Sequence, residues 1–86
     1  MTQPSYEGFR KGVGASIRAR REAAKLTLEE LAHQAGLTVG HLFVIESGRT
    51  NPTLQTIFKV ASALGVRVGA LMDEAERAKS KRPQGV

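Results

Sequence analysis

The chain has 86 residues, a length that provides for one domain with one modest core. It contains no cysteine, which excludes a disulfide framework and a thiolate zinc site and suits a reducing cytoplasm. The net charge is +5, and the isoelectric point of about 10.3 exceeds the value of about 9 that marks candidate nucleic-acid binders. No apolar run reaches the roughly 18–20 residues of a membrane span, and a signal peptide is not apparent, so we expect a cytoplasmic protein without a membrane partner.

The N-terminal part divides into a tail and a helix. Residues 1–8 show no hydrophobic periodicity, so we expect a flexible tail there. Beyond them, apolar side chains recur at helical spacing among basic ones, which predicts an amphipathic helix over residues 10–24. Gly12 and Gly14 weaken its first turns by about 0.5–1 kcal/mol each relative to alanine, so the helix is expected to start as late as Val13.

The most informative stretch is residues 27–48, in which two short helical patterns flank one glycine. Thr27 and Glu30 form the T-x-x-E capping box that opens the first helix. Gly36 can take the left-handed conformation that ends a helix, and Thr38 can cap the next one. A short turn containing glycine sets two helices roughly 90–120° apart, which is the helix-turn-helix arrangement.

Several residues of this stretch recur in a fixed order. They are Ala32, a small residue where the two helices touch, Gly36 in the turn, Leu42 and Ile45, and the segment Ile45-Glu46-Ser47-Gly48-Arg49 with Asn51-Pro52. In this order they resemble the lambda-repressor-like, Cro-type (XRE) helix-turn-helix family over about residues 13–72. The resemblance implies a domain that binds double-stranded DNA and regulates transcription.

Two further helices are predicted after this stretch. Thr53 is placed to cap a helix that ends at Gly65, and residues 66–72 form a short fifth helix. Residues 75–86 are charged and then carry proline and glycine, so we expect a disordered tail there and a domain over residues 9–74. The predicted fold is all-α, a compact bundle of five short helices in which helices 2 and 3 form the helix-turn-helix. Its predicted core is Ile17, Leu28, Leu31, Leu42, Ile45, Leu54, Ile57, Val60, Leu64 and Leu71.

The sequence offers no convergent groups for catalysis or metal binding. His33 and His41 lie on different predicted helices, and Asp73 is the only aspartate. A hydrolytic or metal site needs several such groups close together. We therefore expect a protein that is not an enzyme and holds no metal ion or cofactor.

The second helix of a helix-turn-helix enters the major groove with its N-terminal residues against base edges. If Leu42 and Ile45 face the core, the opposite side offers the predicted base contacts Thr38, Val39, Gly40, His41 and Val44. This set lacks the Arg, Lys, Asn and Gln side chains whose bidentate contacts to bases contribute about 1–3 kcal/mol each. Valine side chains can still pack on thymine methyl groups, and we expect specificity that is modest or relies on groove shape.

Affinity is therefore expected to come mainly from phosphate contacts. The helix start at Leu28 offers backbone N–H groups to a phosphate, and Arg18 adds a positive charge. The resemblance implies further phosphate contacts from Arg49, Thr50 and Asn51. It also implies a structural ion pair between Arg21 and Glu46 beneath the recognition helix.

The residues predict a helix-turn-helix that reads DNA, and the resemblance implies the rest of the role, a sequence-specific transcriptional regulator of repressor type. It would bind an inverted-repeat operator as a homodimer, with recognition helix 38–47 in the major groove and dimer contacts from residues 66–74 and 49–52. A stand-alone repressor, a controller of a restriction-modification system and an antitoxin all fit this size. The alternative from another class is a protein-interaction module, in which Val39, Phe43 and Val44 dock a protein partner.

Overall fold

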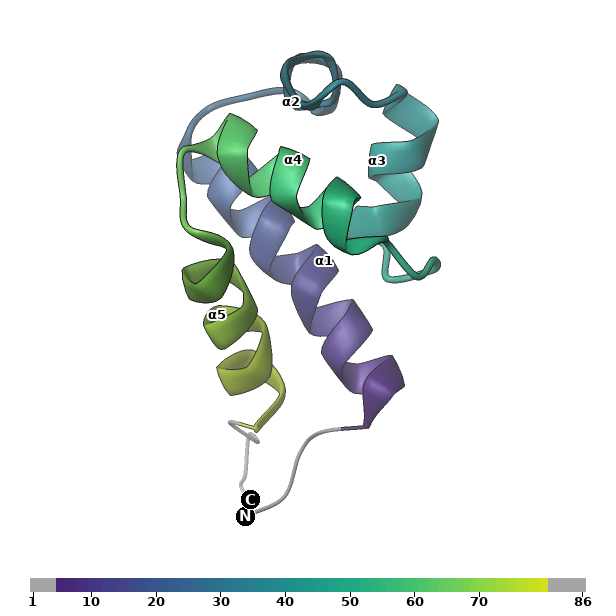
Figure 1. Ribbon diagram of the computed structural model, residues 1–86, viewed down its shortest axis with the longest axis vertical. Coiled ribbons are helices and arrows are strands. Elements are labelled where there is room, and N and C mark those ends of the chain that lie inside the picture. The colour runs from purple at the N-terminus through teal and green to yellow at the C-terminus, as the bar shows by residue number, and fades with distance from the viewer. Residues whose placement is uncertain (1–4, 81–86) are drawn as a thin grey trace.

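The computed structural model describes residues 5–80, and that part of the chain forms five α-helices without a strand (Figure 1). The helices are α1 (Tyr6–Ala23), α2 (Leu28–Ala35), α3 (Val39–Glu46), α4 (Leu54–Leu64) and α5 (Val68–Ser80). This architecture confirms the predicted all-α fold of five helices.

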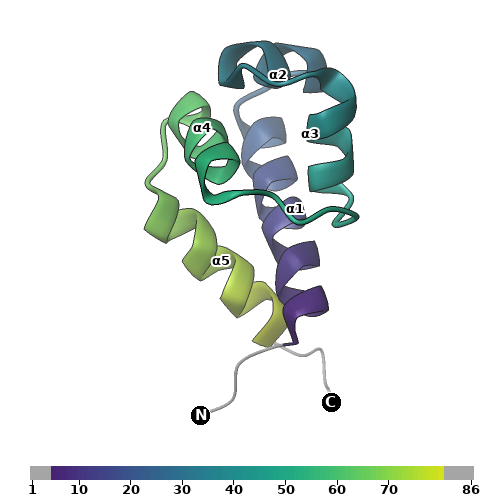
Figure 2. The same ribbon diagram turned by 45° about the vertical axis from the view of Figure 1, so that its right-hand side comes forward.

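The longest helix, α1, is the axis of the bundle. α3, α4 and α5 all contact it, and α2 packs on α3 and α4 (Figures 1 and 2). α5 returns along α1, so that its C-terminal end lies near the first turns of α1 (Figure 2). The helix-turn-helix pair α2 and α3 therefore forms one end of a bundle whose other end is α1 packed against α5.

The core lies where α1 meets the other helices. Most of the predicted core residues are buried, whereas Leu28 and Leu64 are only partly buried. Leu54 was wrongly predicted: its side chain is 83% exposed. Leu54 lies in the first turn of α4. The helical spacing of apolar residues includes this turn, but the turn lies beyond the edge of the core. The buried apolar residues are Val13, Ile17, Leu31, Ala32, Ala35, Leu42, Ile45, Ile57, Val60, Ala61, Leu71 and Ala75.

The predicted caps that bound α2 and open α3 are present. Thr27 Oγ1 accepts a hydrogen bond from Glu30 N at 3.0 Å, and Thr27 N donates to Glu30 Oε1 at 2.8 Å, which completes the capping box. Gly36 ends α2 with a φ of 73°, and Thr38 Oγ1 accepts from His41 N at 3.0 Å to open α3. These local interactions fix the sharp turn between the two helices.

α1 begins earlier than the sequence suggested. Ser5 caps it by accepting a hydrogen bond from Gly8 N at 3.0 Å, and the helix starts at Tyr6. The expected tail over residues 1–8 is therefore wrong for Tyr6, Glu7 and Gly8, and residues 1–4 lie outside the described part. The cap and the packing of the helix outweigh the low helix propensity of its glycines.

α5 is longer than expected. The helix was predicted over residues 66–72, but it continues to Ser80. Ala75 is fully buried and joins the core, and Asp73 pairs with Arg77 one turn later at 3.1 Å. The expected tail over residues 75–86 is thus wrong as far as Ser80, because tertiary packing extends the helix, and residues 81–86 lie outside the described range.

None of the described helices alone combines the length and the apolar composition of a membrane span. Only α4 and α5 taken together, with a bend of 102° between them, meet those two criteria.

Candidate nucleic-acid interface

The outer face of α3 contributes little to the core. Leu42 and Ile45 point inward and are buried. On the other side, Val39 and Phe43 are 40% and 47% exposed. The structure therefore brings the predicted base contacts together on the outer part of one short helix. These are Thr38, Val39, Gly40 and His41, all exposed, and Val44, which is partly buried.

Gly40 leaves an open space in this outer face. A Cβ atom added at Gly40 would meet nothing within 4 Å beyond the helix itself. No neighbouring element therefore requires a glycine at this position, and the backbone of α3 is accessible there.

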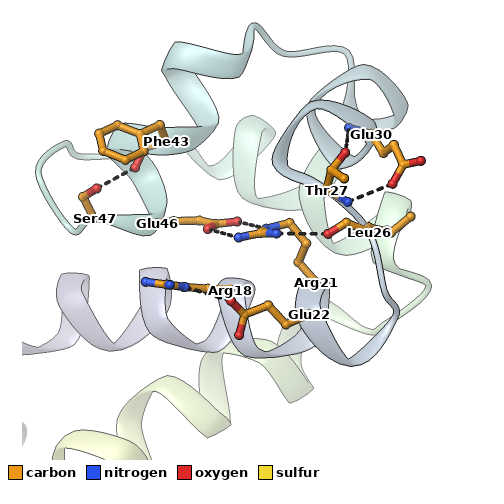
Figure 3. Close-up of polar contacts among 9 residues, drawn as sticks. All are labelled: Arg18, Arg21, Glu22, Leu26, Thr27, Glu30, Phe43, Glu46 and Ser47. Atoms are coloured by element: carbon orange, nitrogen blue, oxygen red, sulfur yellow. Dashed lines mark hydrogen bonds and ion pairs between the residues drawn. The ribbon is translucent and has the colours of Figure 1, made fainter.

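Arg21 and Glu46 form a bidentate ion pair between α1 and the end of α3 (Figure 3). Arg21 Nε donates to Glu46 Oε2 at 2.8 Å, and Arg21 Nη2 donates to Glu46 Oε1 at 3.0 Å. A third bond runs from Arg21 Nη1 to the carbonyl oxygen of Leu26 at 3.0 Å, just before α2. The hydrogen bond with Glu46 raises the pKa of Arg21, so the guanidinium stays charged. One side chain thus joins α1, the entry to α2 and the C-terminal end of α3.

Gly14 explains why α3 lies so close to α1. A Cβ atom added at Gly14 would lie 2.5 Å from the carbonyl oxygens of both Ile45 and Glu46. Only glycine permits this approach of the two helices without a shift of the backbone. This role was not predicted, because from the sequence alone Gly14 is a residue that weakens the first turns of a helix.

A cleft of about 230 Å³ lies between α1, the start of α2 and the C-terminal part of α3. Two predicted phosphate contacts, Arg18 and Leu28, lie at this cleft. Arg18 Nε donates to Glu22 Oε2 at 3.1 Å, and its side chain is 65% exposed (Figure 3). The cleft is lined by Arg18, Arg21, Leu28, Phe43, Glu46 and Ser47.

The remaining predicted phosphate contacts lie in the loop between α3 and α4. Arg49 places its guanidinium over the ring of Phe43 at 5.7 Å from the ring centre. Thr50 is partly buried, and Asn51 is exposed. The loop residue Arg49 thus packs on α3 and places a positive charge beside it.

Two residues that the sequence reasoning did not connect with this loop contact it from α1. Tyr6 and Arg10 both donate hydrogen bonds to Asn51 Oδ1 at 3.1 Å. Their spacing of four residues places them on one face of a helix. That signal was missed because Tyr6 was assigned to a tail.

A family model described as helix-turn-helix matches residues 17–71, and the chain belongs to this family. The resemblance to lambda-repressor-like, Cro-type proteins is thereby confirmed. The chain is 40% identical over 72 residues to the immunity repressor protein of Bacillus phage phi105, which covers 84% of the chain and 50% of the repressor. It therefore spans half the length of that relative.

Two solved structures show the same arrangement of helices. The clp gene regulator ClgR from Corynebacterium glutamicum has a TM-score of 0.82 and 30% sequence identity, over 85% of this chain and 78% of that one. The restriction-modification controller protein C.AhdI from Aeromonas hydrophila has a TM-score of 0.70 and 33% identity, over 71% of this chain and 92% of that one.

Proposed function

We propose that the chain is a sequence-specific DNA-binding regulator of transcription, of repressor type, that occupies an inverted repeat as a homodimer. The observation that carries the proposal is the exposed outer face of α3, held against the bundle by Gly14 and by the Arg21 and Glu46 pair. The three relatives named above are a repressor, a gene regulator and a controller protein, not enzymes, which supports both the regulatory role and the absence of catalysis.

In this proposal α3 enters the major groove, where Val39 and Val44 pack on thymine methyl groups and Thr38 and His41 supply hydrogen bonds. Gly40 allows close approach of the helix backbone to the base edges. The phosphate contacts at Leu28, Arg18, Arg49, Thr50 and Asn51 supply most of the affinity. With few bidentate base contacts available, the shape of the groove contributes to specificity.

The homodimer requires a surface separate from α3, and α4 offers one. Leu54 and Phe58 lie one turn apart on α4 with side chains 83% and 62% exposed. Residues 66–74 suit this role less well than the sequence suggested. Leu71 is fully buried, and Glu74 is engaged by Ser16 and Arg20 of the same chain.

The surface around Leu54 is suited to a second copy of this chain. Leu54 borders a groove of about 200 Å³, and Phe58 projects from the next turn of α4. A two-fold interface pairs the same patch of both copies, so the patch must be self-complementary, and a protruding side chain beside a groove meets that requirement. The groove includes Pro52, so the surface adjoins the loop at residues 49–52 in which dimer contacts were expected. Its lining residues are Tyr6, Phe9, Arg10, Val13, Pro52, Leu54, Ile57 and Met72.

Selection of bound duplexes from a random DNA pool with the 86-residue chain tests the proposed function. We expect an enriched inverted repeat with half-site centres about 34 Å apart, one helical turn. Binding should weaken steeply as salt rises, because neutralised phosphates release their counterions. A pool that stays random, together with a protein complex that survives high salt, would instead support the docking role of Val39, Phe43 and Val44.

The double variant Leu54→Ser with Phe58→Ser tests the dimer surface. Both side chains are exposed, so melting should change little while sedimentation shows a monomer and cooperative binding to the inverted repeat is lost. Gln55→Ser, an exposed change on the same turn, is the matched control and should remain dimeric. A double variant that sediments as a dimer would place the interface elsewhere.

A further inference from the structure

The start of α1 holds the loop that follows the recognition helix. Arg10 Nε donates to the carbonyl oxygen of Gly48 at 2.9 Å, and Arg10 Nη1 donates to Asn51 Oδ1 at 3.1 Å. The hydroxyl of Tyr6 donates to the same amide oxygen at 3.1 Å, while its ring lies 5.8 Å from the guanidinium carbon of Arg10. We call Tyr6, Arg10, Gly48 and Asn51 the loop clamp.

The chemistry of the loop clamp fixes which way the amide of Asn51 faces. A guanidinium has only donors, so the group that faces Arg10 must be the amide oxygen. The NH2 group of Asn51 therefore points away from α1. Among the described residues it meets no hydrogen-bond acceptor, and Asn51 is exposed. Two N–H donors are thus presented to the solvent on the loop that leaves the recognition helix.

The loop backbone also packs directly on α1. Gly48 has a φ of 72°, and a Cβ atom there would lie 2.9 Å from the Cα atom of Lys11. Only glycine fits both this conformation and this distance. Because the backbone and the amide are held before any ligand arrives, binding through Asn51 would not pay the cost of ordering the loop.

We propose that Tyr6 and Arg10 are positioning residues for DNA binding. Through the loop clamp they orient Asn51 so that its NH2 group donates to a phosphate oxygen of duplex DNA. The charge of Arg10, half-buried behind the loop, adds to the attraction for that phosphate. The inference rests on the proposed function, and it assigns a DNA-related role to the first turns of α1, which do not belong to the helix-turn-helix.

The variant Asn51→Asp separates the clamp from the contact with DNA. The carboxylate has almost the same shape and still accepts the bonds from Tyr6 and Arg10, so the fold and its melting temperature should be kept. It replaces the outward donors with a negative oxygen that repels a phosphate. We expect affinity for the selected duplex to fall more than about tenfold, because a charge-assisted contact is replaced by repulsion. The slope of log affinity against log salt should become shallower by up to about 0.9, because the added negative charge offsets the neutralisation of one phosphate.

Gln55→Glu is the matched control for this charge change. It converts a neutral amide into a carboxylate at an exposed position four residues further along the chain. We expect its effect on affinity to stay within about threefold, the size of a screened surface charge. If both variants weaken binding equally, Asn51 makes no specific phosphate contact and the proposal is wrong.

Tyr6→Phe tests the positioning role itself. It removes only the hydroxyl and keeps the ring beneath Arg10, so melting should be unchanged. Affinity should fall about two- to fivefold in the wild-type background but not in the Asn51→Asp background, because the outward donors are then already lost. Equal losses in both backgrounds would show that Tyr6 acts independently of Asn51 and would overturn the proposal.

The proposed function and this inference fail in different ways. If the wild-type chain binds no duplex at any salt concentration, the proposed function is wrong. If the wild type and Asn51→Asp bind the selected duplex equally well, the role of the loop clamp in DNA binding is wrong and the proposed function stands.

Discussion

Two adjacent arginines of α1 pair with glutamates on opposite sides of the bundle. Arg21 joins Glu46 of α3, with side chains 13% and 7% exposed. Arg20 joins Glu74 of α5, with side chains 35% and 34% exposed. The same chemical pair is therefore buried on the side of α1 that supports α3 and partly accessible to water on the side that holds α5.

The difference in exposure determines what each pair contributes. Water can replace a lost partner at the pair with α5, whereas the pair beneath α3 would leave an unpaired charge in the interior. Buried Ser16 also donates to Glu74 Oε1 at 2.7 Å, so the pair with α5 belongs to a small network that extends from Ser16 to the solvent. The stability of α3 should thus depend on its ion pair far more than the stability of α5 does.

The largest effect is expected for Glu46→Ala. Removing this carboxylate leaves Arg21 buried without its partner, and we expect a loss of about 3–5 kcal/mol in the free energy of unfolding. Thermal melting measures it, and Glu74→Ala is the control, with a much smaller loss. Unchanged melting of Glu46→Ala would contradict a buried, stabilising pair, and equal losses in the two variants would show that the two pairs are equivalent. The DNA sequence preference of any folded fraction should stay as in the wild type.

The next effect concerns the contact of α1 with α3. Gly14→Ala forces a methyl group to within 2.5 Å of two carbonyl oxygens, and overpacking of this kind costs about 1–3 kcal/mol. Gly69→Ala is the control in α5, where a Cβ atom meets nothing within 4 Å, and the better helix propensity should stabilise by about 0.5–1 kcal/mol. Urea unfolding of both variants compares them, and stabilisation by Gly14→Ala would contradict the close approach.

The smallest effect is a dependence on acid pH. Hydrogen bonds from Arg20 and Ser16 lower the pKa of Glu74 below its ordinary value. The folded state therefore holds this carboxylate ionised more strongly than the unfolded chain does. The resulting stability is complete above the ordinary pKa of glutamate and is lost as the pH falls through the lowered pKa. Urea unfolding at pH 7 and at pH 3 measures the effect. As the pH falls, the free energy of unfolding should decrease less for Glu74→Gln than for the wild type, and equal decreases would show that the pair contributes nothing.

The helix boundaries that the sequence predicted well are those set by local chemistry. Thr27, Thr38 and Thr53 each cap a helix through a hydrogen bond within three residues. Gly36 and Gly65 end helices by their backbone conformation alone. Such signals need no knowledge of the rest of the fold, so the helix-turn-helix and its register could be predicted from the residues.

The parts that were mispredicted depend on distant contacts. α5 continues because Ala75 reaches the core, and Leu54 is exposed because its turn passes the edge of that core. The role of Gly14 appears only when α3 lies against it. For the candidate site, the outer residues of α3 followed from periodicity. The hydrogen bond from Tyr6 to Asn51 joins positions 45 residues apart, which no local pattern indicates.

If α3 reads DNA as proposed, the open space at Gly40 has a consequence for how this chain could acquire new DNA targets. Because no neighbour limits the side chain there, replacement by a longer residue adds helix propensity and a base-reading group at once. The same substitution would then raise helix stability and exchange close approach of the backbone for a side chain in the groove. In the proposed function, variants of this chain could change operator sequence through position 40 without compensating changes in the core.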